Sequence, residues 1–152
     1  MYRHTQNGTL LVALLGAAVL VTLLILGAVP AAPDEEGGRW VAGLTAVILV
    51  TVAFLFRSLT ITVGNGVLSW SFGPGLIRKS VRLANIERVV PTRTSPLAGW
   101  GIHWTGRGWL YNVAGRGAIE VQMKDGRRFL LGTDEPGRLA RAVEDGLTTV
   151  KV

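Results

Sequence analysis

Apolar and polar positions divide the chain into two apolar runs followed by a long stretch in which the two kinds of residue alternate. The first run contains no charged residue between Thr5 and Pro33, and its apolar centre, Leu10 to Val29, is twenty residues long. A helix of that length spans about 30 Å, the thickness of the hydrocarbon core of a bilayer. A second uncharged run extends from Trp40 to Phe56. The pattern predicts a transmembrane hairpin over residues 1–58, with helices over about 9–29 and 40–57.

The second run is the shorter one, and its sixteen positions from Val41 to Phe56 reach only about 24 Å as a helix. Trp40 before it and Arg57 after it suit the two interfaces of a membrane, so we expect them to act as interfacial anchors. A buried helix of a soluble core would look similar, but the missing polar face and the apolar segment upstream favour a membrane span. Neither apolar core contains an ionisable residue, which argues against a transporter or channel.

Charges around the two runs predict the orientation of the hairpin. The connecting segment, residues 30–39, carries three carboxylates and one arginine, whereas Arg3 precedes the first run and Arg57 follows the second. Since basic flanks favour the cytoplasmic side, we expect an external acidic loop and a multi-pass protein of the cell membrane with both termini in the cytoplasm. The first run also resembles a signal peptide with a cleavage site near Val29-Pro30-Ala31. Its apolar stretch exceeds the usual length of roughly 7 to 15 residues, which favours an uncleaved helix.

Beyond the second run the period changes to the alternation that is typical of strands with one buried face. Leu59 to Val63 and Val67 to Phe72 alternate, and Gly64-Asn65-Gly66 between them tolerates positive φ, which predicts a β-hairpin. Ile77 to Val90 suits one long strand or two short ones, with basic side chains on its solvated side. Asp125-Gly126 predicts another tight turn. Further strands are expected over Gly101–Trp104, Trp109–Val113, Ala118–Met123 and Arg127–Leu131.

The alternation stops at residues 132–136, where Thr133 or Asp134 suits a helix N-cap and Pro136 suits a first helical turn. A helix over about 135–146 is expected, with Leu139 and Val143 among the residues of its apolar face and Gly146 as its C-terminal stop. The elements together predict an α+β membrane protein. Its domain over residues 59–152 is expected to be a small antiparallel β-barrel capped by the C-terminal helix.

Four short segments of this domain are similar in order and spacing to a known family: Gly99-Trp100-Gly101-Ile102, Tyr111-Asn112-Val113-Ala114-Gly115, Asp125-Gly126-Arg127, and Leu131 to Pro136. Residues 59–145 thereby resemble the bacterial pleckstrin-homology-like (PH-like) family of small membrane-anchored proteins. The resemblance implies a PH-like barrel of six or seven strands with a C-terminal helix. It brings no catalytic residues.

The sequence contains few of the residue patterns that catalytic or metal sites require. It contains no cysteine, and its two histidines, His4 and His103, lie far apart in the sequence, so we expect no metal site and no cofactor. The glycine pairs between Gly99 and Gly117 do not join a strand to a helix with the spacing that binds phosphate. No nucleophile motif surrounds Ser95. The sequence therefore favours a protein that is not an enzyme.

Aromatic and basic residues gather between Arg93 and Arg116, where three of the five tryptophans fall within ten residues. Tryptophan and arginine together favour a lipid headgroup boundary. A competing interpretation is that Trp104, with either Trp100 or Trp109, fills the core. The candidate membrane-facing or ligand-facing residues are Arg93, Trp100, Arg107 and Trp109.

Charge favours an acidic surface as the partner of the domain. Residues 57–152 hold fourteen Lys and Arg against seven Asp and Glu, a net charge of +7. Because Ser58 alone separates Arg57 from the first predicted strand, the domain is expected to lie against the lipid bilayer and its anionic headgroups. No helix-turn-helix or basic stripe indicates nucleic acid. The sequence favours a membrane-anchored binding module; the alternative is a scaffold or assembly subunit that holds a membrane protein or a second copy through a strand edge or helix groove.

Overall fold

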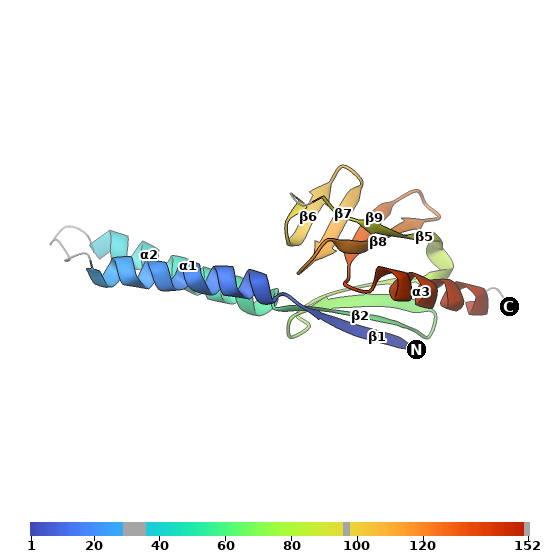
Figure 1. Cartoon of the computed structure of the whole chain (residues 1–152), viewed down its shortest axis with the longest axis horizontal. Helices are drawn as coiled ribbons and strands as arrows, with labels where there is room; N and C mark the ends of the chain where they lie inside the picture. Colours follow the sequence, from blue (N-terminus) through green and yellow to red (C-terminus); the bar gives the residue numbers. More distant parts are fainter. Residues whose placement is uncertain (29–35, 96–97, 151–152) are drawn as a thin grey trace.

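The computed structural model describes residues 1–28, 36–95 and 98–150, so most of the expected acidic loop over 30–39 lies outside the described residues. Two N-terminal helices project from one side of a domain that contains two β-sheets and a C-terminal helix (Figure 1). The predicted α+β class is confirmed. No strand pairing joins the two sheets within the described residues, so the strands form two layers rather than one closed barrel.

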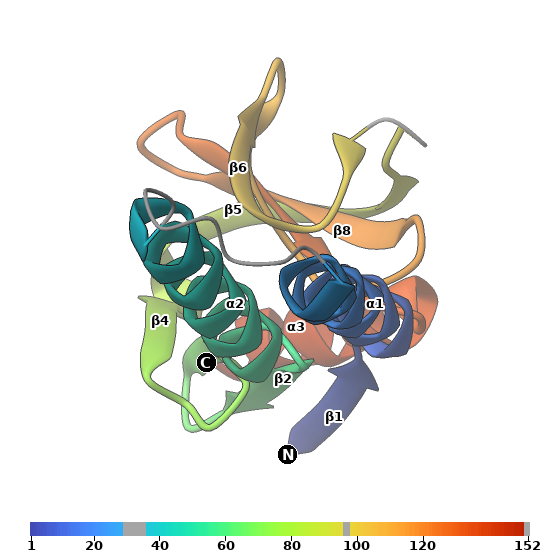
Figure 2. The ribbon, with the colours of Figure 1, turned by 90° about the vertical axis from the view of Figure 1, so that its left-hand side faces the viewer.

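The two helices, α1 (Thr9–Ala28) and α2 (Glu36–Leu55), lie side by side (Figures 1 and 2). Each contains 20 residues, and neither buries any part of its apolar window inside the protein. Soluble monomers rarely expose an apolar surface of this extent. Both helices are long and apolar enough to cross a membrane, which indicates membrane association. α2 begins at Glu36 rather than near Trp40, so the end of the expected acidic loop is helical.

The first sheet contains a strand that the sequence pattern did not predict. β1 precedes α1 and pairs with the strand that follows α2, from Tyr2 opposite Val63 to Asn7 opposite Ser58. Its short alternating segment is mostly polar, so it lacks the apolar signal of a strand. The sheet is antiparallel in the order β1 (Tyr2–Asn7), β2 (Ser58–Gly64), β3 (Val67–Phe72), β4 (Ile77–Arg82).

Side-chain contacts hold β1 in place. Nε2 of His4 lies 2.5 Å from Oδ1 of Asp134, just before the C-terminal helix. Tyr2 packs against the core, where burial first and the carboxylate of Glu135 second raise the pKa of its phenol. The N-terminal strand is therefore part of the domain, and a fragment that began at β2 would leave the edge of β2 without its partner.

The predicted hairpin between β2 and β3 is confirmed, with Asn65 and Gly66 at φ values of 51° and 72°. The segment from Ile77 to Val90 forms two strands. A short 3₁₀ turn, η1 (Leu83–Asn85), separates β4 from β5 (Ile86–Arg93), which joins the other sheet.

The second sheet has the order β5-β8-β9-β7-β6, and its strands bring the total to nine within the described residues, against the six or seven expected. Its pairs are antiparallel except for β7 with β9, which is parallel. The expectation of a purely antiparallel barrel is therefore wrong at this pair. The bounds are β6 (Gly101–Thr105), β7 (Gly108–Asn112), β8 (Gly117–Met123) and β9 (Arg128–Gly132).

The C-terminal helix, α3 (Pro136–Val150), packs against β5, β8, β2 and η1 and fully buries Leu139 and Val143. Oγ1 of Thr133 accepts a hydrogen bond from the Glu135 amide in the turn before the helix, and the Glu135 carbonyl oxygen accepts the first helical hydrogen bond, from the Leu139 amide. The N-cap position is therefore Glu135, not Thr133 or Asp134 as predicted, whereas Pro136 lies in the first helical turn as expected. The prediction that Gly146 ends the helix is wrong. A Cβ on Gly146 would lie 2.5 Å from Cδ1 of Leu83, so glycine serves close packing against η1 instead.

Gly108 permits the parallel pairing of β7 with β9. A Cβ at this position would lie 2.3 Å from the Arg128 carbonyl oxygen, and its φ of +125° disfavours any side chain. We expect Gly108→Ala to cost about 1–3 kcal/mol and to lower the Tm of the full chain in nanodiscs by at least about 4 °C. Gly106→Ala, in the turn directly before β7 and with open space around it, is the control. Equal Tm values for the two variants would contradict this role of Gly108.

Candidate functional site

Two of the predicted candidates, Arg93 and Arg107, lie next to each other. Arg107 extends from the turn between β6 and β7 and donates hydrogen bonds to the Arg93 carbonyl oxygen at 3.2 Å and to Oγ1 of Thr92 at 3.4 Å. It also lies 3.6 Å from a carboxylate oxygen of Glu120. The charge of Arg107 is therefore partly neutralised within the domain, whereas the Arg93 side chain is exposed.

The tryptophans of the 93–116 segment do not fill the core. Trp104 and Trp109 are 65% and 46% exposed and form an edge-to-face pair with ring centroids 5.9 Å apart. Trp100, directly before β6, is half-buried, and β6 lies on the side of the domain from which the helices project (Figures 1 and 2). The tryptophan that does fill the core is Trp70, from β3.

The turn between β3 and β4, residues 73–76, lies against the end of α2. A Cβ on Gly73 would lie 2.5 Å from the Leu55 carbonyl oxygen. Within this turn Leu76 is 76% exposed. Of the two expected anchors, Arg57 lies just beyond α2 with its guanidinium 5.2 Å from the centroid of the Phe54 ring, and Trp40 is 79% exposed on α2. The turn and Arg57 thus share the boundary between helix and domain.

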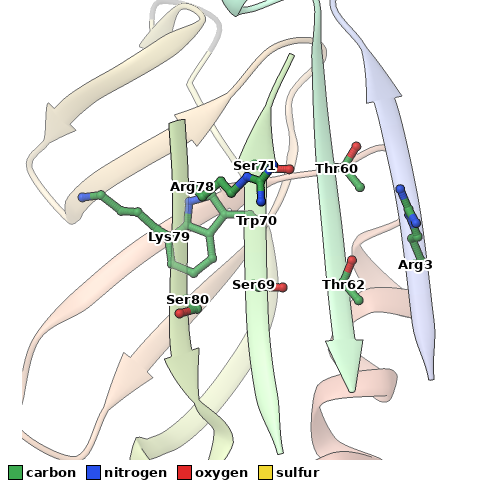
Figure 3. Close-up of a pocket in the computed structure, with 9 residues that line it drawn as sticks. All are labelled: Arg3, Thr60, Thr62, Ser69, Trp70, Ser71, Arg78, Lys79 and Ser80. Atoms are coloured by element: carbon green, nitrogen blue, oxygen red, sulfur yellow. The ribbon is translucent and has the colours of Figure 1, made fainter. Parts of the chain in front are cut away.

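The outer face of the first sheet carries hydroxyl and guanidinium groups, and we call it the hydroxyl face (Figure 3). Strand alternation places most polar side chains of the four strands on this side, whereas His4, Gln6 and Lys79 alternate to the other side; none of the four strands contains an acidic residue. Nε of Arg78 donates to the Gly75 carbonyl oxygen, which directs this cation along the face. The residues that line its shallow depression of about 550 Å³ are Arg3, Thr60, Thr62, Ser69, Trp70, Ser71, Arg78, Lys79 and Ser80.

A second concave site lies between the sheets, beside the free edge of β4, and we call it the aromatic cleft. Its volume is about 560 Å³. Trp70 stacks on Phe129 with centroids 5.0 Å apart, and Nζ of Lys79 donates to the Tyr111 hydroxyl at 2.8 Å. The residues that line it are Trp70, Lys79, Ser80, Val81, Trp109, Tyr111, Met123, Arg127, Arg128 and Phe129.

The cations around the aromatic cleft differ in how far they are neutralised. Arg127 donates hydrogen bonds to Asp125, and these bonds lower the pKa of the Asp125 carboxyl, which is therefore charged at neutral pH. Arg128 lies 4.0 Å from a carboxylate oxygen of Glu120, at the limit of an ion pair. Lys79 has no carboxylate partner within the described part of the chain. Lys79 and Arg128 therefore carry most of the positive charge at the cleft.

Sequence reasoning found the Arg93–Arg116 segment but not the two surfaces. The hydroxyl face has a sequence signal, because serine, threonine and arginine occupy its polar positions. The aromatic cleft has none, since Trp70, Tyr111 and Phe129 come from separate strands. Among residues 1–28, 36–95 and 98–150, no three His, Cys, Asp or Glu side chains gather closely enough to hold a metal. No protein-family model, curated protein or solved structure matches the chain.

The bond between Lys79 and Tyr111 joins the two sheets across the cleft. We expect a double-mutant cycle with Lys79→Met and Tyr111→Phe to give a coupling energy of about 0.5–1.5 kcal/mol. The measurement is urea unfolding of the full chain in nanodiscs, followed by tryptophan fluorescence. Lys124→Met, an exposed position that does not line the cleft, is the control and should not couple to Tyr111→Phe. A coupling near zero for Lys79 would contradict the bond.

Proposed function

We propose that the chain is a membrane-anchored PH-like binding module without enzymatic activity, which binds anionic headgroups of the leaflet from which its domain projects. One observation carries the proposal. The strand register aligns Thr60, Ser71 and Arg78 in one row across β2, β3 and β4, which is the first row of the hydroxyl face. Thr60 is only two residues beyond Ser58, the first residue of β2. Two residues of a strand extend about 7 Å, which keeps this row within the headgroup layer if α2 spans the membrane.

The composition of the hydroxyl face supports an anionic ligand. Hydroxyl and guanidinium groups donate hydrogen bonds to phosphate oxygens, and each cation near an anionic leaflet contributes about 1 kcal/mol. Arg3 and Arg78 lie at opposite edges of the face, with the hydroxyl rows between them. The face is therefore suited to headgroups that approach along the strands.

Other residues on the helix side extend this surface. Leu76 can place an exposed apolar side chain at the interface, and Arg57, just beyond α2, can place a cation there. From the second sheet, Arg93 and Trp100 remain candidates for the leaflet-facing surface. Two packed sheets with a C-terminal helix suit a PH-like domain. The basic flanks of the helices support a cell-membrane location with both termini in the cytoplasm.

The alternative is a protein-interaction scaffold, or self-association, through a strand edge or a helix groove. Within the described residues β4 has a strand neighbour on one side only, so a peptide could in principle extend the sheet. However, β4 carries Arg78, Lys79 and Arg82, and charged side chains on an edge strand oppose pairing with another chain. The leaflet is therefore the better supported partner.

The chain contains no cysteine, so a single introduced cysteine can be labelled uniquely. We expect bimane at Leu76→Cys to be quenched by lipids with nitroxide headgroups, because the turn that holds it lies at the membrane boundary. The full chain is measured in nanodiscs of neutral and of anionic lipid. Ala84→Cys in η1, at the far end of the sheet, is the matched position and should be quenched much less.

Anionic lipid should increase the quenching at Leu76→Cys, and Arg78→Gln should remove most of that increase. Arg3→Gln, on β1 at the opposite edge of the sheet from β4, should reduce it in the same direction. Arg141→Gln, an exposed arginine of α3, is the charge-matched control and should leave the increase unchanged. Equal quenching at positions 76 and 84, or equal effects of the Arg78 and Arg141 variants, would overturn the proposal.

A further inference from the structure

Trp70, which lines the aromatic cleft, carries a buried hydrogen-bond donor without a partner in the described residues. Trp70 is only 4% exposed, and its Nε1–H has no acceptor within the described part of the chain. Figure 3 shows its ring extending from β3 across β4, the strand that lines the cleft. A buried donor without a partner costs about 1–3 kcal/mol. An acceptor supplied by a ligand would remove that cost.

The polar groups that line the cleft are almost all donors. The Tyr111 oxygen already accepts from Lys79, which leaves the hydroxyl hydrogen of Tyr111 to donate. Lys79 and Arg128 are donors as well, and none of the described Asp or Glu residues lines the cleft. A ligand of this site must therefore bring acceptors, and the positive charge favours an anion over a neutral acceptor.

The size and the aromatic walls of the cleft indicate the rest of the ligand. A volume of about 560 Å³ falls within the range of small-molecule pockets. Trp109, which is 46% exposed, and Phe129 line the cleft and offer apolar contact. Such walls suit a flat or short aliphatic body, since aromatic side chains bury large areas against rings and chains.

We infer that the aromatic cleft is a binding site for a small amphiphilic anion, whose carboxylate or phosphate accepts hydrogen bonds from Trp70, Tyr111 and Lys79 while its apolar body lies against Trp109. The cleft adjoins the hydroxyl face, and Trp70, Lys79 and Ser80 line both, but the inference does not depend on lipid binding at that face. It also gives a role to Trp109, which the sequence placed among the candidate ligand-facing residues.

The experiment uses the full chain in nanodiscs of neutral lipid, with ¹⁵N in the tryptophan indoles. The probes are 4-phenylbutyrate and phenyl phosphate, and the neutral reference is 4-phenylbutanol. The Trp70 indole resonance is assigned from its loss in Trp70→Phe. We expect at least one anion to shift this resonance downfield in a saturable manner, and the neutral alcohol to bind about tenfold more weakly.

Lys79→Gln should weaken binding of the anion about tenfold, whereas Lys124→Gln, an exposed lysine outside the cleft, should not change it. If neither anion shifts the Trp70 resonance saturably, the inference is overturned. Equal affinities for the alcohol and the anions, or equal effects of the two lysine variants, would also overturn it. None of these outcomes depends on anionic lipid, so a failure here is distinguishable from a failure of leaflet binding.

Discussion

The pairing of β1 with β2 is the constraint on which the rest of the structure depends. The two strands flank the helical hairpin in the sequence, and the Gly8 amide donates to the Arg57 carbonyl oxygen at 2.8 Å where the strands meet the helices. A Cβ on Gly8 would lie 2.9 Å from the Phe56 carbonyl oxygen, so the junction is closely packed. The domain is thus attached to the hairpin at two adjacent points, which restricts how it can tilt relative to the helices.

This attachment determines what each surface can meet. The strands of the first sheet continue away from the helix ends, so one row of the hydroxyl face lies beside the boundary. Strand alternation then separates two chemistries on the same strands: Ser69 and Ser71 lie outside, whereas Trp70 between them lies inside. Likewise Arg78 lies on the hydroxyl face, and Lys79 reaches the aromatic cleft. A polar cationic surface and an aromatic site therefore adjoin each other at β3 and β4, where Trp70, Lys79 and Ser80 line both.

The candidate sites could be predicted only in part. The adjacency of Trp104 and Trp109 follows from their hairpin, but their exposure does not, because it depends on which elements cover that end of the sheet. The sequence around Arg107 suggests a surface cation without an ion-pair partner. In the structure a carboxylate oxygen of Glu120, from another strand, lies 3.6 Å from its guanidinium. Trp70 occupies an inward-facing position in the alternating pattern of β3, as an ordinary core residue would. The sequence does not reveal that the indole N–H of Trp70 lacks an acceptor among the described residues, because its burial depends on the opposite sheet.

The sequence by itself determined the two long apolar helices, the Asn65-Gly66 and Asp125-Gly126 turns and the C-terminal helix with Pro136 in its first turn, because each depends on residues close together in the chain. Only the tertiary structure decided the pairing of β1, the parallel contact of β7 with β9 and the continuation of α3 through Gly146. These features join segments far apart in the sequence, where packing and strand pairing outweigh local preference. The aromatic cleft also depends on the tertiary structure, because its lining residues come from β3, β4, β7 and β9 among other segments.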